Sequence, residues 1–138
     1  MYIPKHFKPQ EFVPPSVYND RGDKSLQLID DRILRIADYL RERYGSTTIN
    51  NWCWGGNRQW SGLRTPDSPY YSMYSQHTMG RAVDCIFKDI SAEEVREDIK
   101  KADILTDLAL SSVTLEDGVS WLHIDVRNNK LGINSFLP

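Results

Sequence analysis

The sequence predicts an α+β domain, in which helices pack on one face of a small, mostly antiparallel sheet. Three observations support this prediction. Apolar residues recur at three- and four-residue steps between Lys24 and Tyr44, which is typical of an amphipathic helix. Residues 81–87 alternate as a strand does, and Asp117-Gly118 separates two further β-type segments, which indicates a hairpin.

The chain has 138 residues and fits one domain, because domains commonly run to about 100–150 residues. Residues 1–23 are rich in proline and contain several aromatic and apolar residues. We therefore expect them to form an irregular arm that packs on the domain. The N-terminus lacks the apolar core of a secretory signal. This favours a protein made in the cytoplasm that reaches any outer target by another route.

Between residues 24 and 74 the sequence predicts a helix, a strand and a long loop. The helix covers Lys24–Tyr44 and ends at Gly45, as helices often end at glycine. The β-branched and aromatic residues of Thr47–Trp54 favour a strand. Gly55–Tyr74 reads as a loop, and loops longer than about 12–15 residues in compact domains are usually functional or disordered. Its many aromatic residues favour a functional loop.

The remaining elements are a strand, a second helix and a hairpin. Arg81–Phe87 is the strand. Ser91-Ala92-Glu93-Glu94 has the pattern of a capping box, which begins a helix. Ser112–Leu115 and Val119–Val126 are expected to pair as antiparallel strands across a two-residue turn.

Composition excludes several classes of partner. A net charge of −2 gives no reason to expect nucleic acid or an anionic membrane surface as a partner. No apolar run is long enough to span a bilayer.

The spacing of Cys53 and Cys85 fits neither a zinc knuckle nor a redox pair. Both lie in predicted strands, so they could be neighbours in space. In a cytoplasmic protein they would be reduced, and outside the cell they could form a bridge.

Two of the three histidines lie in segments that can form a metal site. His77 precedes the strand that carries Asp84, and Gly80 gives the backbone freedom for a turn between them. His123 lies in the predicted hairpin, from which a neighbouring strand can reach the same place. Three protein ligands leave a fourth position of zinc open for water, as in catalytic sites. The sequence therefore predicts a zinc hydrolase with His77, Asp84 and His123 as ligands.

The predicted ligands belong to two longer patterns, Ser75-x-His77-x-x-Gly80-x-Ala82-x-Asp84 and Trp121-x-His123-x-Asp125. Together these patterns resemble the M15 metallopeptidases. That family comprises zinc D-alanyl-D-alanine carboxypeptidases and their phage and bacterial endopeptidase relatives, which share a fold with the hedgehog signalling domain. The resemblance covers the chain from about residue 7 to residue 126 and is greatest with the short phage-associated members. It implies a hedgehog-like fold, Zn²⁺ on the three ligands, and the stem peptide of bacterial peptidoglycan as substrate.

The resemblance also implies an arginine ahead of the first histidine, where it binds the substrate carboxylate or the developing oxyanion. Arg64 matches that context best, and Arg58 is the alternative because this loop is longer than usual in the family. The planar guanidinium of arginine can bind a carboxylate at two points. Tyr74 and Ser75, in the loop just before His77, are the remaining candidates for contact with substrate.

The general base is where the chain departs from the family. Many relatives carry Asp or Glu three residues before the last histidine, and here that position is Ser120. Glu116 is one substitute, although a two-residue turn would pair it with Val119, about 13 Å along the strand from His123. Asp125 is the other, at about 7 Å on the same strand face. A carboxylate that merely orients a ligand histidine would lie in the same position as Asp125.

Two functions are consistent with these residues. The first is a zinc peptidase that cleaves a peptide bond of the bacterial cell wall, with neither nucleic acid nor membrane as a partner. The second is a zinc-binding structural or interaction domain without catalysis, for example a virion component that contacts other phage virion proteins. The missing acid at Ser120 favours the second function.

Overall fold

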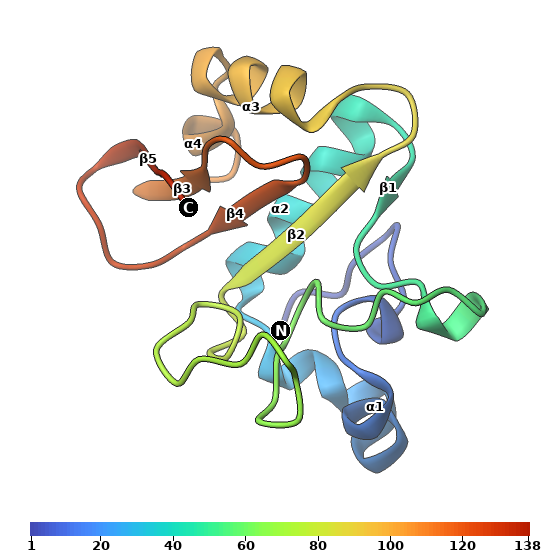
Figure 1. The fold of residues 1–138 in the computed structure, drawn as a ribbon. Helices are drawn as coiled ribbons and strands as arrows, with labels where there is room; N and C mark the ends of the chain where they lie inside the picture. Colours follow the sequence, from blue (N-terminus) through green and yellow to red (C-terminus); the bar gives the residue numbers. More distant parts are fainter.

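The computed structural model describes residues 1–138 (Figure 1). Its α-helices are α1 (Pro15–Arg21), α2 (Asp31–Tyr44), α3 (Ala92–Lys101) and α4 (Ile104–Asp107), and none is both long and apolar enough to cross a membrane. Three short 3-10 helices lie at Pro9–Glu11, Gly22–Leu28 and Trp52–Trp54. The strands are β1 (Thr47–Thr48), β2 (Ala82–Phe87), β3 (Ser112–Glu116), β4 (Leu122–Asp125) and β5 (Gly132–Phe136).

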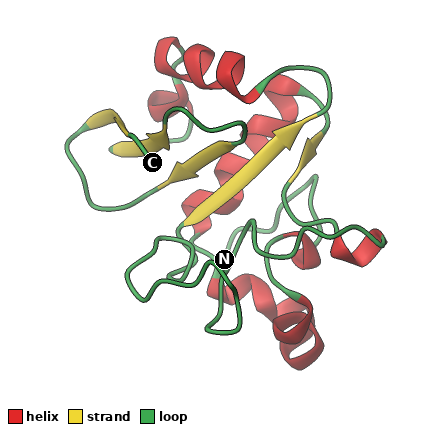
Figure 2. Cartoon of the chain, in the orientation of Figure 1, coloured by secondary structure: helices red, strands yellow, loops and turns green.

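The five strands form one sheet in the order β1-β2-β4-β3-β5. Every neighbouring pair is antiparallel except β3 and β5, which run parallel. Helix α2 lies behind β2 in the view of Figure 2 and packs against it. The fold is therefore α+β with a mostly antiparallel sheet, as the sequence predicts.

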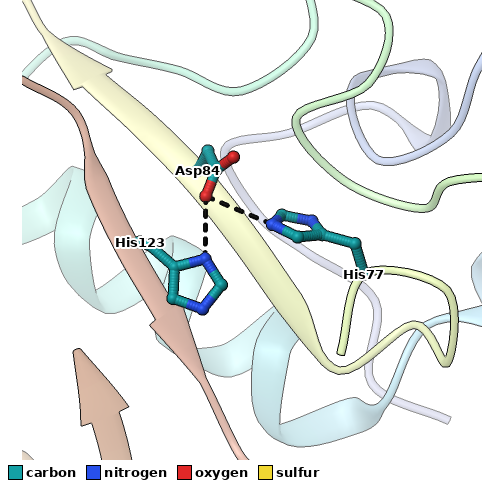
Figure 3. Close-up of side chains that lie close together, drawn as sticks. All are labelled: His77, Asp84 and His123. Atoms are coloured by element: carbon teal, nitrogen blue, oxygen red, sulfur yellow. Dashed lines mark hydrogen bonds and ion pairs between the residues drawn. The ribbon is translucent and has the colours of Figure 1, made fainter. Parts of the chain in front are cut away.

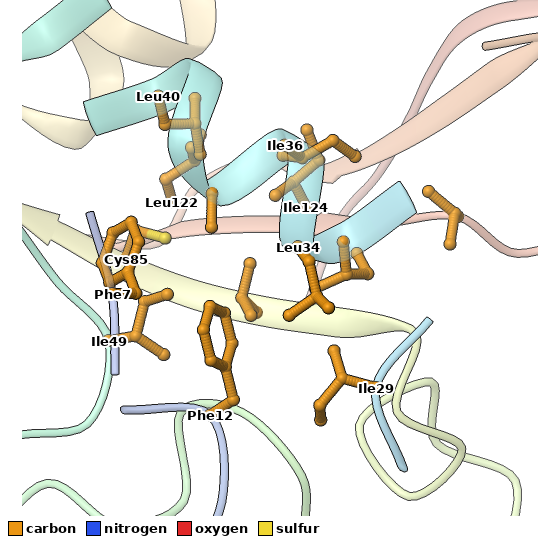
Figure 4. Packing of buried hydrophobic residues seen from close by; sticks show 14 of the residues in the cluster. Phe7, Phe12, Ile29, Leu34, Ile36, Leu40, Ile49, Cys85, Leu122 and Ile124 are labelled. Atoms are coloured by element: carbon orange, nitrogen blue, oxygen red, sulfur yellow. The ribbon is translucent and has the colours of Figure 1, made fainter. Parts of the chain in front are cut away.

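The two faces of the sheet have different roles, because successive strand residues point to opposite sides. Asp84 and His123 lie on the face away from the hydrophobic core, while their strand neighbours pack with helix α2 (Figure 4). Burying one Val, Leu or Ile side chain stabilises a protein by about 1.5–3 kcal/mol. A one-residue slip in the pairing of two strands would exchange their faces and expose the apolar side chains. Burial of these side chains therefore fixes the register. The core residues of β2 and β4 are Val83, Cys85, Phe87, Leu122 and Ile124.

The N-terminal arm packs on the domain as predicted, since Phe7, Phe12 and Val13 are buried. It is not irregular throughout, because α1 forms a helix there. Pro15 is the first residue of α1. Proline is well suited to this position, since its ring fixes a helical φ and the first N–H of a helix has no partner in any case. The proline that suggested irregular structure therefore begins a helix.

The predicted helix Lys24–Tyr44 begins later than expected, at Asp31. The residues before it form a 3-10 helix instead. The side chain of Asp30 accepts a hydrogen bond from the backbone N–H of Arg32 at 2.9 Å, which caps α2. The N–H of Asp30 donates to the carbonyl of Gly80, so the start of α2 is tied to the turn before β2.

The predicted strand Thr47–Trp54 is mostly wrong. Only its first two residues pair with β2, and its last three form a 3-10 helix. The side chain of Asn50 donates to the carbonyl of Val13 and accepts from the N–H of Ser61. Asparagine side chains that bind backbone groups in this way compete with strand pairing. The segment therefore connects the N-terminal arm to the loop before the site.

Both cysteines are free thiols. Cys53 lies in the 3-10 helix Trp52–Trp54 and not in a strand, whereas Cys85 lies in β2 within the core. Burial raises the pKa of each thiol above its usual value. Both side chains are therefore protonated at neutral pH.

The second helix and the hairpin follow the sequence more closely. Ser91 Oγ accepts a hydrogen bond from the N–H of Glu94, as the capping box predicts. Strands β3 and β4 pair antiparallel, with Leu115 opposite Ile124. The prediction of a two-residue turn is wrong, because residues 117–121 form a longer loop between β3 and β4. The observed register, continued by one residue, brings Glu116 opposite His123.

A buried arginine of α3 holds the loop 117–121 in place. The guanidinium of Arg96 donates to the carbonyl oxygens of Val119 and Trp121, at 3.0 Å each, and lies 3.7 Å from the carboxylate of Asp117. Arg96 is only 4% exposed. The conformation of the loop thus depends on contacts with a residue distant in sequence. Rules for turns consider only neighbouring residues and do not include such contacts.

Replacing Arg96 with Met should lower the free energy of unfolding by about 1–3 kcal/mol, because two carbonyl groups lose their partner. Urea denaturation followed by circular dichroism measures the change. Lys101→Met is the control, since Lys101 is an exposed residue of the same helix, and surface changes usually stay within about 0.5 kcal/mol. Equal stability of the two variants would contradict the anchoring role of Arg96.

Candidate metal centre

The three predicted ligands come together on the polar face of the sheet (Figure 3). Asp84 Oδ1 lies 3.2 Å from His77 Nε2 and 2.9 Å from His123 Nδ1. One possible ligand atom from each residue lies within 4.8 Å of the other two. All three residues are buried, with exposed fractions of 3%, 9% and 7%. The group can therefore hold a metal ion with little movement of the side chains.

The sheet and a tight turn position these ligands. Asp84 and His123 are direct partners in the pairing of β2 with β4. His77 enters from the turn before β2, where Gly80 has a φ of 68°. That φ disfavours residues with a side chain, and a Cβ there would also collide with the backbone carbonyl of Leu28. The glycine thus permits both the turn and its close approach to the residues before α2.

Each histidine is oriented by a hydrogen bond at its second nitrogen. His77 Nδ1 lies 2.8 Å from the carbonyl oxygen of Gly62, which can only accept, so Nδ1 carries the proton and Nε2 is free for a metal. His123 Nε2 lies 2.8 Å from a carboxylate oxygen of Asp125 and donates to it. Ligand histidines commonly donate their other N–H to a carboxylate or carbonyl in this way. The arrangement therefore fits a metal better than an isolated pair of histidines would.

The electrostatics of the metal-free group follow from these contacts. Burial alone would raise the pKa of Asp84, but the hydrogen bond from His123 and the nearby His77 imidazole hold it below its usual range. Burial alone would lower the pKa of His123, but hydrogen bonds to Asp125 and Asp84 raise it to about 9. Without metal, His123 is thus a cation between two carboxylates. A metal ion held by this group would take the place of the proton on Nδ1.

A cavity of about 790 Å³ opens over the three ligands. It is much larger than a metal ion needs, and cavities of about 300–1,000 Å³ are typical of sites for small molecules. Three arginines and two carboxylates give its wall a mixed charge. Its side chains include Arg58, Arg64, Arg127, Asp84, Glu116, Trp60, Tyr70, Tyr74, Trp121 and Phe136.

Glu116, one of the two predicted substitutes for the base, lies in this cavity, whereas a two-residue turn would have placed it too far from His123. The longer loop shifts the pairing, so that Glu116 is the cross-strand neighbour of His123. Side chains directly opposite each other in a sheet have Cβ atoms about 4.5–5.5 Å apart. The Glu116 side chain is half-buried and makes no hydrogen bond or ion pair. Its carboxylate is therefore available to a molecule bound beside the metal centre.

The two candidate arginines have different surroundings. Arg64 donates from Nη2 to Asp84 Oδ2 at 3.0 Å and from Nε to the carbonyl of Trp60 at 2.8 Å. It therefore fixes the second oxygen of Asp84, and Arg64 also lines the cavity. Arg58 makes hydrogen bonds only through its backbone, and its side chain also lines the cavity. Its guanidinium is free for an anionic group.

Tyr74 and Ser75, the two remaining candidates for contact with substrate, both line the cavity. Tyr74 is 83% exposed and stands at the rim, whereas Ser75 Oγ accepts from the N–H of His77. Sequence reasoning missed Arg127 and Phe136, which also line the cavity. Arg127 follows the motif Trp121-x-His123-x-Asp125 by two residues, which was an available signal. Nothing in the sequence near Phe136 indicates the site.

Asp125 lies behind His123 and not in the cavity. It is 0% exposed, and Arg127 donates to both of its oxygens, from Nε at 2.9 Å and from Nη2 at 2.6 Å. Burial alone would raise the pKa of Asp125, but the hydrogen bonds from His123 and Arg127 lower it. Asp125 is thus an ionised carboxylate whose hydrogen-bonding capacity is already used.

The fold and the site define an α+β domain with a buried His-Asp-His group that can hold a metal ion at the base of a large cavity. Comparison of the chain with protein-family models, curated proteins and solved structures finds no match. Its function is therefore inferred from the residues of the site and their geometry.

Proposed function

We propose that this protein is a zinc-dependent hydrolase that cleaves a peptide bond in bacterial peptidoglycan. The observation that carries the proposal is the convergence of His77, Asp84 and His123 beneath a cavity that also contains a free carboxylate. Two nitrogens and one carboxylate oxygen form a ligand set that suits zinc. The choice of peptidoglycan as the substrate rests on the resemblance to the M15 metallopeptidases. The same resemblance implies a hedgehog-like fold.

The reaction needs a group that moves a proton, and Glu116 is suited to this role. His77, Asp84 and His123 would hold the zinc ion, which when bound would supply the Lewis acidity that polarises a carbonyl group and acidifies water. Glu116 accepts the proton of the attacking water and passes it to the nitrogen of the leaving amine. Because the Glu116 carboxylate has no partner of its own, it needs to break no contact to do so.

The arginines complete the site. The N–H groups of Arg64 that remain free bind the oxygen on which negative charge develops, and its bond to Asp84 keeps the guanidinium beside the ligands. Arg58 binds a carboxylate of the stem peptide farther along the cavity. Asp125 orients His123 and does not act as the base, since it lies outside the cavity.

A second candidate is a zinc-binding virion component without catalysis, which contacts other phage proteins. Ser120 favours it, because this residue occupies the position where many relatives of the resembled family carry their acid. The position of Glu116 favours the enzyme, since it returns a carboxylate to the cavity.

The first test is zinc content measured together with release of fragments from purified peptidoglycan sacculi. We expect about one zinc per chain and the appearance of new amino groups or D-alanine, both lost on chelation and restored by added zinc. The products also identify the bond that is cleaved. Zinc without release would favour the virion component, and the absence of zinc would refute both candidates.

A further inference from the structure

On the side of His123 that faces away from the metal centre, Asp125 is itself held by Arg127, a residue with no role in the mechanism above. His123 donates to Asp125 Oδ2 at 2.8 Å. The same carboxylate receives three hydrogen bonds from Arg127, from its backbone N–H at 3.1 Å, from Nε at 2.9 Å and from Nη2 at 2.6 Å. Both oxygens of Asp125 are thereby fixed, and so is the direction in which Oδ2 accepts from His123.

Arg127 is itself held in place by a second contact. Its guanidinium lies 4.8 Å from the ring centroid of Phe136, a residue of β5 that also lines the cavity. The ring of Phe136 lies edge-on to that of His123, with centroids 5.7 Å apart. Asp125 and Phe136 thus both contact the imidazole of His123, and Arg127 contacts both of them.

We propose that Arg127 is a positioning residue of the metal centre, which acts through Asp125 to set the orientation of His123. The arginine fork suits this role, because it binds both oxygens of a carboxylate in one plane, which the single charged group of lysine does not. Partners beyond the ligands typically contribute about 10- to 100-fold to metal affinity. The inference rests on the proposed metal site and extends it by one residue.

The charge of Arg127 and its positioning role have opposite effects on metal binding. A cation near the site repels a metal cation, so removal of the charge alone would strengthen metal binding. Loss of the fork would free Asp125 and allow the His123 ring to turn, which would weaken metal binding. The sign of the change therefore separates the two effects.

The test is zinc affinity, measured by competition with a chromophoric chelator, for wild type, Arg127→Met and Arg127→Lys. We expect affinity to fall by about 10- to 100-fold in Arg127→Met and by less in Arg127→Lys, which keeps the charge but loses the fork. The visible spectrum of bound Co²⁺ should also change in Arg127→Met, because the orientation of a ligand has changed. Arg58→Met is the matched control, since it removes a cavity arginine that has no carboxylate partner. Its affinity should be equal to that of wild type or higher.

Unchanged or tighter zinc binding in Arg127→Met, with an unchanged Co²⁺ spectrum, would overturn the inference and leave the proposed function intact. If Arg127→Met fails to fold, Arg127→Lys decides: weaker binding supports the role, and equal binding overturns it. A wild-type protein that binds no zinc would overturn the inference and the proposed function together.

Discussion

Replacing Glu116 with Gln should lower the rate of peptide hydrolysis by about 100- to 10,000-fold, which is the usual contribution of a general base. The amide keeps the size of the side chain but does not accept a proton at neutral pH. The zinc content should remain that of wild type, because Glu116 is not among the three converging ligands. The measurement is kcat on a defined muropeptide, with zinc determined in the same preparation.

Asp117→Asn is the matched control for Glu116→Gln. Asp117 is the next residue in the chain, but its carboxylate pairs with Lys100 at 3.1 Å and does not line the cavity. The control should therefore retain the wild-type kcat. Equal activity of the Glu116 variant and wild type would exclude Glu116 as the base. Loss of zinc in that variant would instead indicate damage to the metal centre.

The three residues of the candidate metal centre are predictable from the sequence because their spacing encodes the geometry. His77 and Asp84 are separated by one turn and part of a strand, and a glycine marks the turn. His123 lies on a strand that alternates between core and polar side chains, so its face is fixed by the burial of its neighbours. Local pattern and global fold agree here, which is why the group could be predicted from the sequence alone.

The position of Glu116 was not predictable in the same way. Asp117-Gly118 is a strong signal for a two-residue turn, and that turn would separate Glu116 from His123. The actual loop is longer because Arg96, a residue of helix α3, donates hydrogen bonds to two carbonyl groups of the loop. A contact between residues more than 20 positions apart leaves no local pattern. Arg64 was a candidate from the sequence, but its bond to Asp84, which joins the long loop to β2, leaves no local pattern either.

Zinc affinity should rise about tenfold from pH 7 to pH 8 and about fivefold from pH 8 to pH 9, because the metal displaces one proton from His123. The cause is the pKa of about 9 that Asp125 and Asp84 give to His123 despite its burial. A histidine with an ordinary pKa of about 6.5 would already be neutral in this range, and its zinc affinity would change little. Competition titrations at pH 7, 8 and 9 measure the slope. A flat profile would show that His123 is neutral in the metal-free protein.

The stability of the metal-free protein should have the opposite dependence on pH. The pKa of His123 is raised on folding, so its contribution is fully present below about pH 6.5 and is lost as pH rises through about 9. The pKa of Asp84 is lowered on folding, so its contribution is present above about pH 4 and is lost in acid. Thermal denaturation with a chelator should therefore give the highest Tm between about pH 4 and 6.5. With zinc present, the increase in Tm over the chelated protein should grow from pH 7 to 9, because binding tightens as the proton leaves. If both forms lost stability in parallel over that range, His123 would not be the group at which proton and metal compete.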